Sequence, residues 1–334
     1  MKKVMKWMLL LGMIAILSGC SSAIKKQGID TADKVEEPEQ EIVTVELEKE
    51  EPTPTLAPLP TAEPNPEVAQ VEFPEKEQVI TEADETPVHE KDMQLVFLGD
   101  SIFDNDRDGT GVPYLTAVQC DADVYNLAMG GTCAAVELTD QLANEEWTSA
   151  SLCGVVKVIQ GLVPSDVLKG YRAKEVIDSS NIDFAQTDYF IIEYGINDFL
   201  SAKPLSNSDE YFDMRTYVGA LRYAVTALRE VAPNAQIILC CPHYCQFYNQ
   251  GWMVGDSNSL NNGYGTLRDY KGKCEYLSGE LGTMFYNAYD HLGIDGYTAD
   301  EYLEDGIHLT EEGRQLYADA LARLINANEE QKNS

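Results

Sequence analysis

The stretch QLVFLGDSIFDN (residues 94–105) joins an apolar run to a polar turn. Four consecutive apolar residues lead into Gly-Asp-Ser, a pattern that predicts a strand over residues 94–100, buried on both faces. Gly99 permits a sharp exit from this strand. Ser101 then lies just past the carboxyl end of the strand, where it is either an ordinary turn residue or a nucleophile.

The rest of the folded part repeats this alternation of short apolar runs and longer helical stretches. Strands are predicted over residues 94–100, 122–128, 188–195, 235–241 and 282–288. Apolar strands separated by helices predict an α/β fold, with a parallel sheet of about five strands covered by helices on both faces. Ligands of such folds bind beyond the carboxyl ends of the strands, where Ser101 lies.

Helical periodicity is clearest over residues 217–233. The face predicted to be buried consists of Val218, Leu221, Val225 and Leu228. Thr310 is a plausible N-cap for the final helix, since two glutamates follow it. The folded domain is predicted over residues 93–328, with a disordered tail over 329–334.

The N-terminal residues 1–19 have the features of an export signal. Three lysines precede an apolar core of about eleven residues, too short to span a bilayer core of about 30 Å. The segment ends in Leu-Ser-Gly-Cys20, which resembles the bacterial lipobox. The resemblance implies a lipid anchor on Cys20 at the outer face of the cytoplasmic membrane. An ordinary signal peptide containing a cysteine is the alternative.

Residues 20–92 are predicted to form a disordered, acidic, proline-rich tether behind that cysteine. Residues 30–92 carry 20 Asp or Glu against 4 Lys, a composition that cannot bury a core. The chain as a whole has a net charge of −32. Nucleic-acid binding is disfavoured, because phosphate contacts need clusters of Lys and Arg and the sequence has none.

Seven of the eight cysteines remain once Cys20 is set aside, and their spacing is not that of a disulfide framework. Cys240, Cys241 and Cys245 with His243 suggest a metal site. The stretch begins as a buried strand, however, and packing of the thiols as small apolar residues is favoured.

The acids after Ser101 suggest a second metal site. Asp104 to Gly109 match the first half of a calcium-loop pattern. The twelfth position is Leu115, where the pattern needs a bidentate acid. A solvated acidic loop is favoured, and neither a metal nor another cofactor is expected.

A serine nucleophile needs a base, a group that orients the base and donors for an oxyanion. The chain has four histidines. His89 lies in the tether and His243 has no acid close in sequence, whereas His308 follows Asp305 by three residues. His308 is therefore the preferred base, with Asp305 accepting from its Nδ1 proton, and His291, beside Asp290, is the fallback.

Two further segments end strands at the same edge of the predicted sheet. Gly130 and Gly131 follow the second strand, where a missing side chain lets a backbone N–H approach a substrate. Asn197 follows the third strand and has a side-chain amide that can donate to an oxyanion. Asp100 and Asp198 are expected to hold loops by hydrogen bonds.

Together the four blocks Gly-Asp-Ser, the glycine after the second strand, Gly-Ile-Asn-Asp and Asp-x-x-His resemble the SGNH hydrolases, also called GDSL esterases. The blocks occur in order over essentially the whole folded domain. The resemblance implies a flavodoxin-like three-layer α/β/α sandwich. It implies the nucleophile Ser101, the triad partners Asp305 and His308, and an oxyanion hole of the Ser101 N–H, Gly131 and Asn197. Phe103 departs from the family's usual first block and is expected to shape the pocket floor.

The motifs leave the substrate open. Residues 243–276 combine Tyr, Phe and Trp with Asn and Gly on a predicted rim loop, a composition that suits sugar rings. A short-acyl esterase acting on O-acetyl groups of carbohydrate is therefore preferred, with a small-molecule or polysaccharide ester as substrate. A lysophospholipase-type acyl hydrolase and a non-catalytic glycan-binding surface module are the alternatives.

Overall fold

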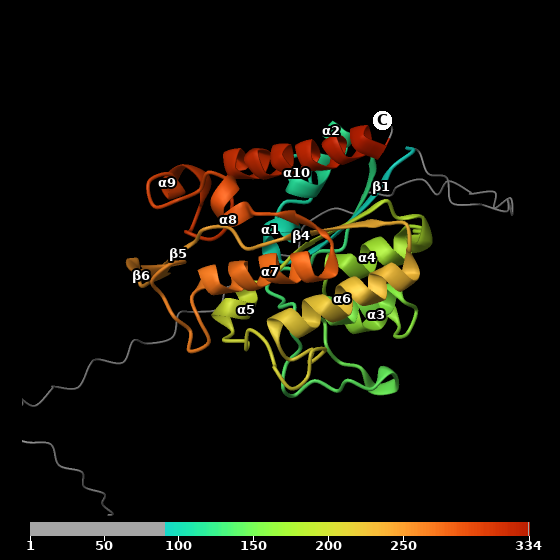
Figure 1. Ribbon diagram of the computed structural model, residues 1–334, viewed down its shortest axis with the longest axis horizontal. Helices are drawn as coiled ribbons and strands as arrows, with labels where there is room; N and C mark the ends of the chain where they lie inside the picture. The colour runs from blue at the N-terminus through green and yellow to red at the C-terminus, as the bar shows by residue number, and fades with distance from the viewer. Residues whose placement is uncertain (1–90, 333) are drawn as a thin grey trace, which may run out of the picture. The chain divides into compact units, whose positions relative to one another are not determined.

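Five parallel strands form the main sheet of the computed structural model, which describes residues 91–332 and 334 (Figure 1). They are β1 (Gln94–Gly99), β2 (Asp123–Asn126), β3 (Tyr189–Glu193), β4 (Gln236–Cys240) and β7 (Met284–Tyr286), in the spatial order β2-β1-β3-β4-β7. Each lies within a predicted strand, so the predicted parallel α/β fold is confirmed. The export signal, Cys20, His89 and nearly all of the tether lie outside the described residues.

The strand order reverses direction beside β1. The chain passes from β1 to β2 on one side and then crosses to β3 on the other, with Gly99 of β1 paired to Glu193 of β3. Such a reversal opens a crevice at the carboxyl ends of the strands. Ser101 follows β1 and Asn197 follows β3, so both lie at this crevice.

Helices cover both faces of the sheet (Figure 1). On one face α2 (Val112–Cys120) packs against α10 (Glu311–Lys332), and on the other α6 (Tyr217–Val231) packs against α3 (Leu152–Ile159) and α7 (Leu267–Leu281). The shorter α-helices are α1 (Ser101–Asp104), α4 (Arg172–Ser179), α5 (Ile196–Leu200), α8 (Ala288–His291) and α9 (Ala299–Tyr302). No helix in the described part of the chain has the length and apolar character needed to cross a membrane.

The predicted helix over residues 217–233 is α6. The side chain of Thr216 accepts from the Gly219 N–H at the start of α6, and all four residues of the predicted face are buried. At the start of α10 the Thr310 hydroxyl accepts from the Gly313 N–H at 3.2 Å, which confirms Thr310 as its cap.

The first four residues of the segment 329–334, for which disorder is predicted, are helical instead. Helix α10 continues to Lys332. The buried hydroxyl of Tyr189 donates to Glu329 and accepts from Asn328 at 2.6 Å. This long-range contact extends the helix beyond the point at which the apolar pattern stops.

The aromatic stretch over residues 243–276 is not a simple rim loop. Antiparallel strands β5 (Gln246–Asn249) and β6 (Trp252–Asp256) form a hairpin, and α7 begins at Leu267. Tyr244, Phe247 and Tyr270 pack into the core, while Tyr248, Trp252 and Tyr264 are exposed. The turn of the hairpin has positive φ at both Gln250 and Gly251, as a two-residue turn requires.

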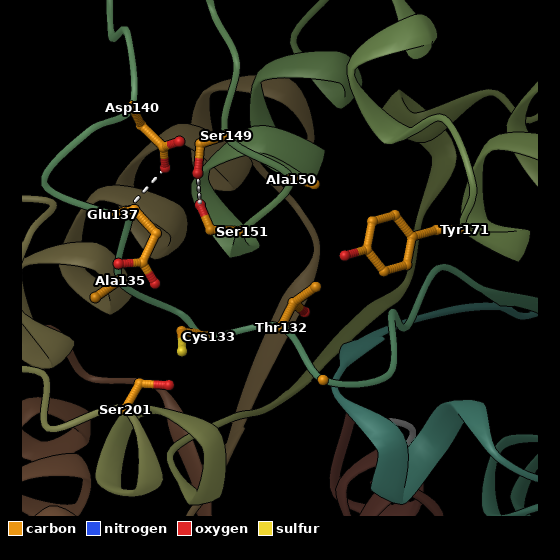
Figure 2. A pocket seen from close by; sticks show the side chains of 11 residues that line it. Thr132, Cys133, Ala135, Glu137, Asp140, Ser149, Ala150, Ser151, Tyr171 and Ser201 are labelled. Atoms are coloured by element: carbon orange, nitrogen blue, oxygen red, sulfur yellow. Dashed lines mark hydrogen bonds between the residues drawn. The ribbon is translucent and has the colours of Figure 1, made fainter. Parts of the chain in front are cut away.

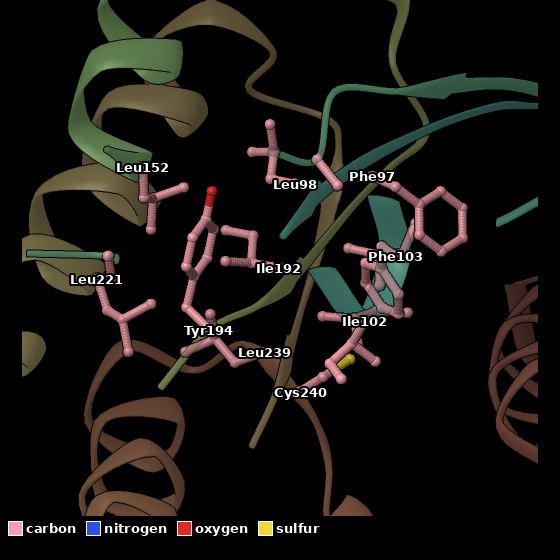
Figure 3. Packing of buried hydrophobic residues seen from close by; sticks show 14 of the residues in the cluster. Phe97, Leu98, Ile102, Phe103, Leu152, Ile192, Tyr194, Leu221, Leu239 and Cys240 are labelled. Atoms are coloured by element: carbon pink, nitrogen blue, oxygen red, sulfur yellow. The ribbon is translucent and has the colours of Figure 1, made fainter. Parts of the chain in front are cut away.

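The thiols behave as small core residues. Within the described residues all seven cysteines are buried and unpaired, so the predicted packing role of Cys240, Cys241 and Cys245 is confirmed. Phe103 also lies in the core, with its ring edge-on to Phe97 at 5.3 Å between centroids (Figure 3). It therefore does not form the floor of a pocket as predicted.

Candidate functional site

Ser101, His308 and Asp305 come together in one hydrogen-bonded chain across 207 residues of sequence. The Ser101 Oγ lies 2.9 Å from the His308 Nε2, and the His308 Nδ1 lies 2.7 Å from the Asp305 Oδ2. A carboxylate only accepts, so Nδ1 carries the proton and Nε2 is left to accept from the serine hydroxyl. The arrangement can therefore transfer the serine proton to the imidazole.

A tight turn presents Asp305 to His308. The Asp305 Oδ1 accepts from the N–H groups of Ile307 at 3.0 Å and His308 at 2.8 Å. Burial alone would raise the pKa of Asp305, but these hydrogen bonds and the imidazole lower it. Asp305 therefore remains a carboxylate opposite Nδ1.

Strand β5 supports this turn from behind. The Gln246 N–H donates to the Gly306 carbonyl at 2.8 Å. Gly306 has φ of +87°, and a Cβ there would lie 2.3 Å from the Gln246 carbonyl oxygen. Only glycine fits, because both the backbone angle and the space exclude a side chain.

The Gly130–Gly131 turn lies beside the nucleophile. A Cβ built on Gly130 would lie 3.7 Å from the Ser101 Cβ. The Gly130 N–H is already bound to the Asp104 Oδ2 at 2.8 Å, whereas no acceptor among the described residues takes the N–H of Gly131 or of Ser101. Gly131 rather than Gly130 therefore has a backbone donor to offer.

Asn197, which follows β3, also lies close to the nucleophile. Its Nδ2 donates to the Asp100 Oδ2 at 3.0 Å, and Asp100 precedes Ser101 directly. An amide nitrogen has two hydrogens, so one remains for a ligand. The Ser101 N–H, the Gly131 N–H and Asn197 thus converge on one edge of the sheet.

Asp100 and Asp198 hold loops by hydrogen bonds, as predicted. Asp198 accepts from the N–H groups of Ala134 at 2.9 Å and Ala135 at 3.0 Å, which fixes the segment after Gly131. Burial raises the pKa of Asp198 to about 7, against the effect of these two bonds. Asp100 accepts from the Ile102 N–H at 3.0 Å and caps α1.

The acidic loop after Ser101 is engaged in internal contacts. Asp104 forms an ion pair with Arg107 at 2.6 Å, and Arg107 also donates to the carbonyls of Asn126 at 2.7 Å and Ala128 at 2.6 Å. These contacts tie the loop to the segment after β2. Within the described residues no group of three or more His, Cys, Asp or Glu side chains is arranged to hold a metal ion.

The other described histidines lie elsewhere. His291 is exposed on α8, at a separate surface hollow lined by Asn287 and Arg323, and does not take part in the triad geometry. His243 is fully buried, and its Nε2 lies 2.8 Å from the Ile307 carbonyl oxygen. Nothing in the local sequence connects His243 with this site, because its partner Ile307 lies 64 residues away.

A small cavity with a mixed polar and apolar lining opens beside Gly131 (Figure 2). Its volume is about 200 Å³. Its polar side chains are Thr132, Cys133, Glu137, Asp140, Ser149, Ser151, Tyr171 and Ser201. Figure 2 shows Tyr171 and Ser201 on opposite sides of the cavity. A group bound there would meet hydroxyls and two carboxylates alongside apolar surface.

Solved structures share this fold. One from Lactobacillus plantarum is 18% identical, with a TM-score of 0.50 over 72% of this chain and 99% of its own. A protein of Chitinophaga pinensis described as a possible lipase is 16% identical, with a TM-score of 0.50 over 71% and 98%. No curated protein matches the chain in sequence.

The family comparison is more specific than these structural likenesses. Residues 97–316 match the model of the GDSL-like lipase/acylhydrolase family. This match covers most of the chain and every residue of the hydrogen-bonded geometry described above. The chain therefore belongs to the GDSL-like lipase/acylhydrolase family, the SGNH hydrolases, and is a carboxylic ester hydrolase.

Proposed function

We propose that the protein is a serine esterase that removes short acyl groups, such as acetyl, from carbohydrate. The observation that carries the catalytic assignment is the 2.9 Å contact between the Ser101 Oγ and the His308 Nε2, with Asp305 on the far side of the ring. Ser101 is the nucleophile, His308 the general base and acid, and Asp305 the group that orients the imidazole.

The reaction proceeds in two balanced halves. The Ser101 Oγ attacks the ester carbonyl while its proton passes to His308, and the N–H groups of Ser101 and Gly131 with the Asn197 amide stabilise the oxyanion. His308 returns the proton to the leaving alkoxide, which departs as an alcohol and leaves an acyl-serine. Water then attacks the acyl-serine by the same route and releases the acid.

The cavity beside Gly131 supports a short acyl group. At about 200 Å³ it is smaller than the 300–1,000 Å³ typical of pockets for drug-sized ligands. Each buried methylene contributes about 0.8 kcal/mol in an apolar environment, and this small cavity shares its lining between apolar surface and hydroxyls and carboxylates. A long acyl chain would gain little from this cavity, whereas a polar sugar can hydrogen-bond to it.

Exposed aromatic residues on the hairpin support a carbohydrate substrate. Trp252 is 79% exposed and Tyr248 is 47% exposed on β6 and β5. Strand β5 also contacts the loop of Asp305, which connects these rings to the site. Aromatic faces stack on sugar rings, so the hairpin would lie along a bound polysaccharide.

The proposed location is the outer face of the bacterial cytoplasmic membrane. The lipobox-like sequence ending at Cys20 motivates this proposal, and the acidic tether could extend roughly 240 Å at about 3.3 Å per residue. The test is metabolic labelling with a lipid analogue. The wild type should be labelled and Cys20→Ala should not, and equal labelling of both would reject the anchor.

Ser101→Ala tests the catalytic assignment. The variant should lose hydrolysis of p-nitrophenyl acetate and labelling by a fluorophosphonate, while its thermal unfolding matches that of the wild type. Undiminished labelling would refute Ser101 as nucleophile. A wild type that binds glycans but hydrolyses no ester would instead favour the non-catalytic module.

Substrate class is tested with acyl chains of increasing length and with acetylated polysaccharides. Activity should fall from acetyl to octanoyl esters, and lysophospholipids should react poorly. Trp252→Ala should raise KM for acetylated polysaccharide and leave p-nitrophenyl acetate hydrolysis unchanged. Tyr276→Ala, an exposed aromatic on α7, is the matched control. Preference for long acyl chains would reject the carbohydrate assignment in favour of a lysophospholipase.

A further inference from the structure

Two buried carboxyl groups face each other directly behind the nucleophile. Glu193 ends β3 and pairs in the sheet with Gly99, and Asp100 follows Gly99 in the chain. Both side chains have no exposed surface. Acids are almost never buried this completely without a partner, so each must satisfy its oxygens within the protein.

Asp100 is well satisfied, and its partners belong to the site. Its Oδ1 accepts from the Ile102 N–H at 3.0 Å, in the first turn after Ser101, and its Oδ2 accepts from the Asn197 Nδ2 at 3.0 Å. Asp100 therefore fixes the orientation of the Asn197 amide, which leaves the second amide hydrogen free for an oxyanion.

Glu193 has no such partners. No N–H or O–H group of the described residues donates to either of its carboxyl oxygens. The group that it contacts is the carboxyl of Asp100. Two acids in contact away from water share a hydrogen bond only when one of them carries a proton, and both charges together would be strongly unfavourable.

We propose that Glu193 is a positioning residue that remains protonated and donates its proton to Asp100, which stays ionised and holds Asn197 in the oxyanion hole. This inference rests on the oxyanion role proposed above for Asn197. The chain of contacts runs from Glu193 to Asp100 and then to Asn197. Glu193 itself touches no substrate.

The surroundings place the proton on Glu193 rather than on Asp100. Burial, followed by the charges of Asp100 and Asp198, raises the pKa of Glu193 well above its usual value. Burial raises the pKa of Asp100 only to about 6, because the hydrogen bonds it accepts and the nearby His308 act in the opposite direction. Asp100 therefore ionises first.

The test compares two replacements of similar volume. Glu193→Gln keeps a donor to Asp100 and should retain kcat within about threefold. Glu193→Met fills the same space without a donor, and its kcat should fall roughly 10- to 100-fold with KM unchanged, bounded by the 10²–10³-fold cost of one lost oxyanion donor. Thermal unfolding of both variants shows whether either has failed to fold.

A double-mutant cycle with Asn197→Ala separates positioning from general damage. If Glu193 acts through Asn197, Glu193→Met should lower kcat no further once Asn197 is alanine. Additive losses, or equal losses in the Gln and Met variants, would overturn the role of Glu193 alone. An Asn197→Ala variant with unchanged kcat would overturn the proposed oxyanion hole itself, and the positioning role with it.

Discussion

The Nε2 of His243 donates to the carbonyl oxygen of Ile307 at 2.8 Å, one residue before His308. The carbonyl can only accept, so the proton lies on Nε2, and the buried Nδ1 has no partner among the described residues. His243 is therefore neutral and supports the backbone that carries His308. Burial lowers its pKa to about 4, although the bond to Ile307 acts in the opposite direction.

This depressed pKa predicts acid sensitivity. An unfolded histidine titrates near 6.5, so His243 contributes stability above that pH and loses it as the pH falls toward 4. The full effect is about 3 kcal/mol, at about 1.4 kcal/mol per pH unit for one proton. His243→Gln keeps a donor for Ile307 and cannot be protonated, so its free energy of unfolding should fall less between pH 6.5 and 4.

Denaturant titrations at several pH values check this difference. Comparison with the wild type is needed because Asp100 and Asp198 have raised pKa values and gain stability as the pH falls, against the trend of His243. His291→Gln, at an exposed position on α8, is the matched control and should follow the wild type. Parallel pH curves for the wild type and His243→Gln would contradict the prediction.

Replacing Asp305 with asparagine should lower kcat by about 10³–10⁴-fold with little change in stability. The side chain keeps its shape and can still accept from the N–H groups of Ile307 and His308. An amide nitrogen opposite Nδ1 would then favour the wrong imidazole tautomer. Asp300→Asn makes the same charge change on α9 and should retain full activity in p-nitrophenyl acetate assays. Equal activity of the two variants would argue against the orienting role of Asp305.

Alanine at Gly131 should reduce activity beyond what its strain explains. Gly131 has φ of +77° and Gly161 has φ of +70°, and a Cβ at either position meets no atom within 4 Å. Each substitution should therefore lower the free energy of unfolding by a similar amount, about 1–2 kcal/mol, through backbone strain. Gly131→Ala should also lower kcat/KM at least tenfold, because the methyl group would enter the cavity that Gly131 lines, whereas Gly161→Ala should not. Equal kcat/KM in the two variants would remove Gly131 from the site.

The sequence was sufficient to predict the five strands and to predict that Ser101, His308 and Asp305 lie together. Continuous apolar runs predict the strands. Asp305 and His308 lie three residues apart in one turn, so their pairing can be predicted from local spacing. Glu193 and His243 could not be found in this way. The partner of each lies far away in the sequence. Glu193 looks like an ordinary acid at the end of a strand, and only folding brings it next to Asp100.

The β5–β6 hairpin lacks the sequence pattern by which hairpins are usually predicted. Its turn, Asn249-Gln250-Gly251, places positive φ at Gln250 and Gly251, which is the requirement of a tight hairpin turn. Asn-Gly or Asp-Gly would have signalled it, whereas glutamine at the first position does not. Alternation also fails in β6, where Trp252, Met253 and Val254 are all exposed.

Removal of residues 329–334 should destabilise the protein, because α10 ends on Tyr189 rather than in solvent. Tyr189 is fully buried, its hydroxyl donates to Glu329, and the Lys332 ammonium lies 5.0 Å from its ring centroid. Loss of a hydrogen bond to a charged group costs about 1.5–3 kcal/mol, which lowers Tm by several degrees in a domain of this size. Calorimetry of the truncated chain checks this. Tyr189→Phe should lower Tm in the full chain and lower it by less in the truncated chain, since Glu329 is then absent and only Asn328 still bonds to the hydroxyl. A truncated chain with unchanged Tm would show that the end of α10 contributes nothing to stability.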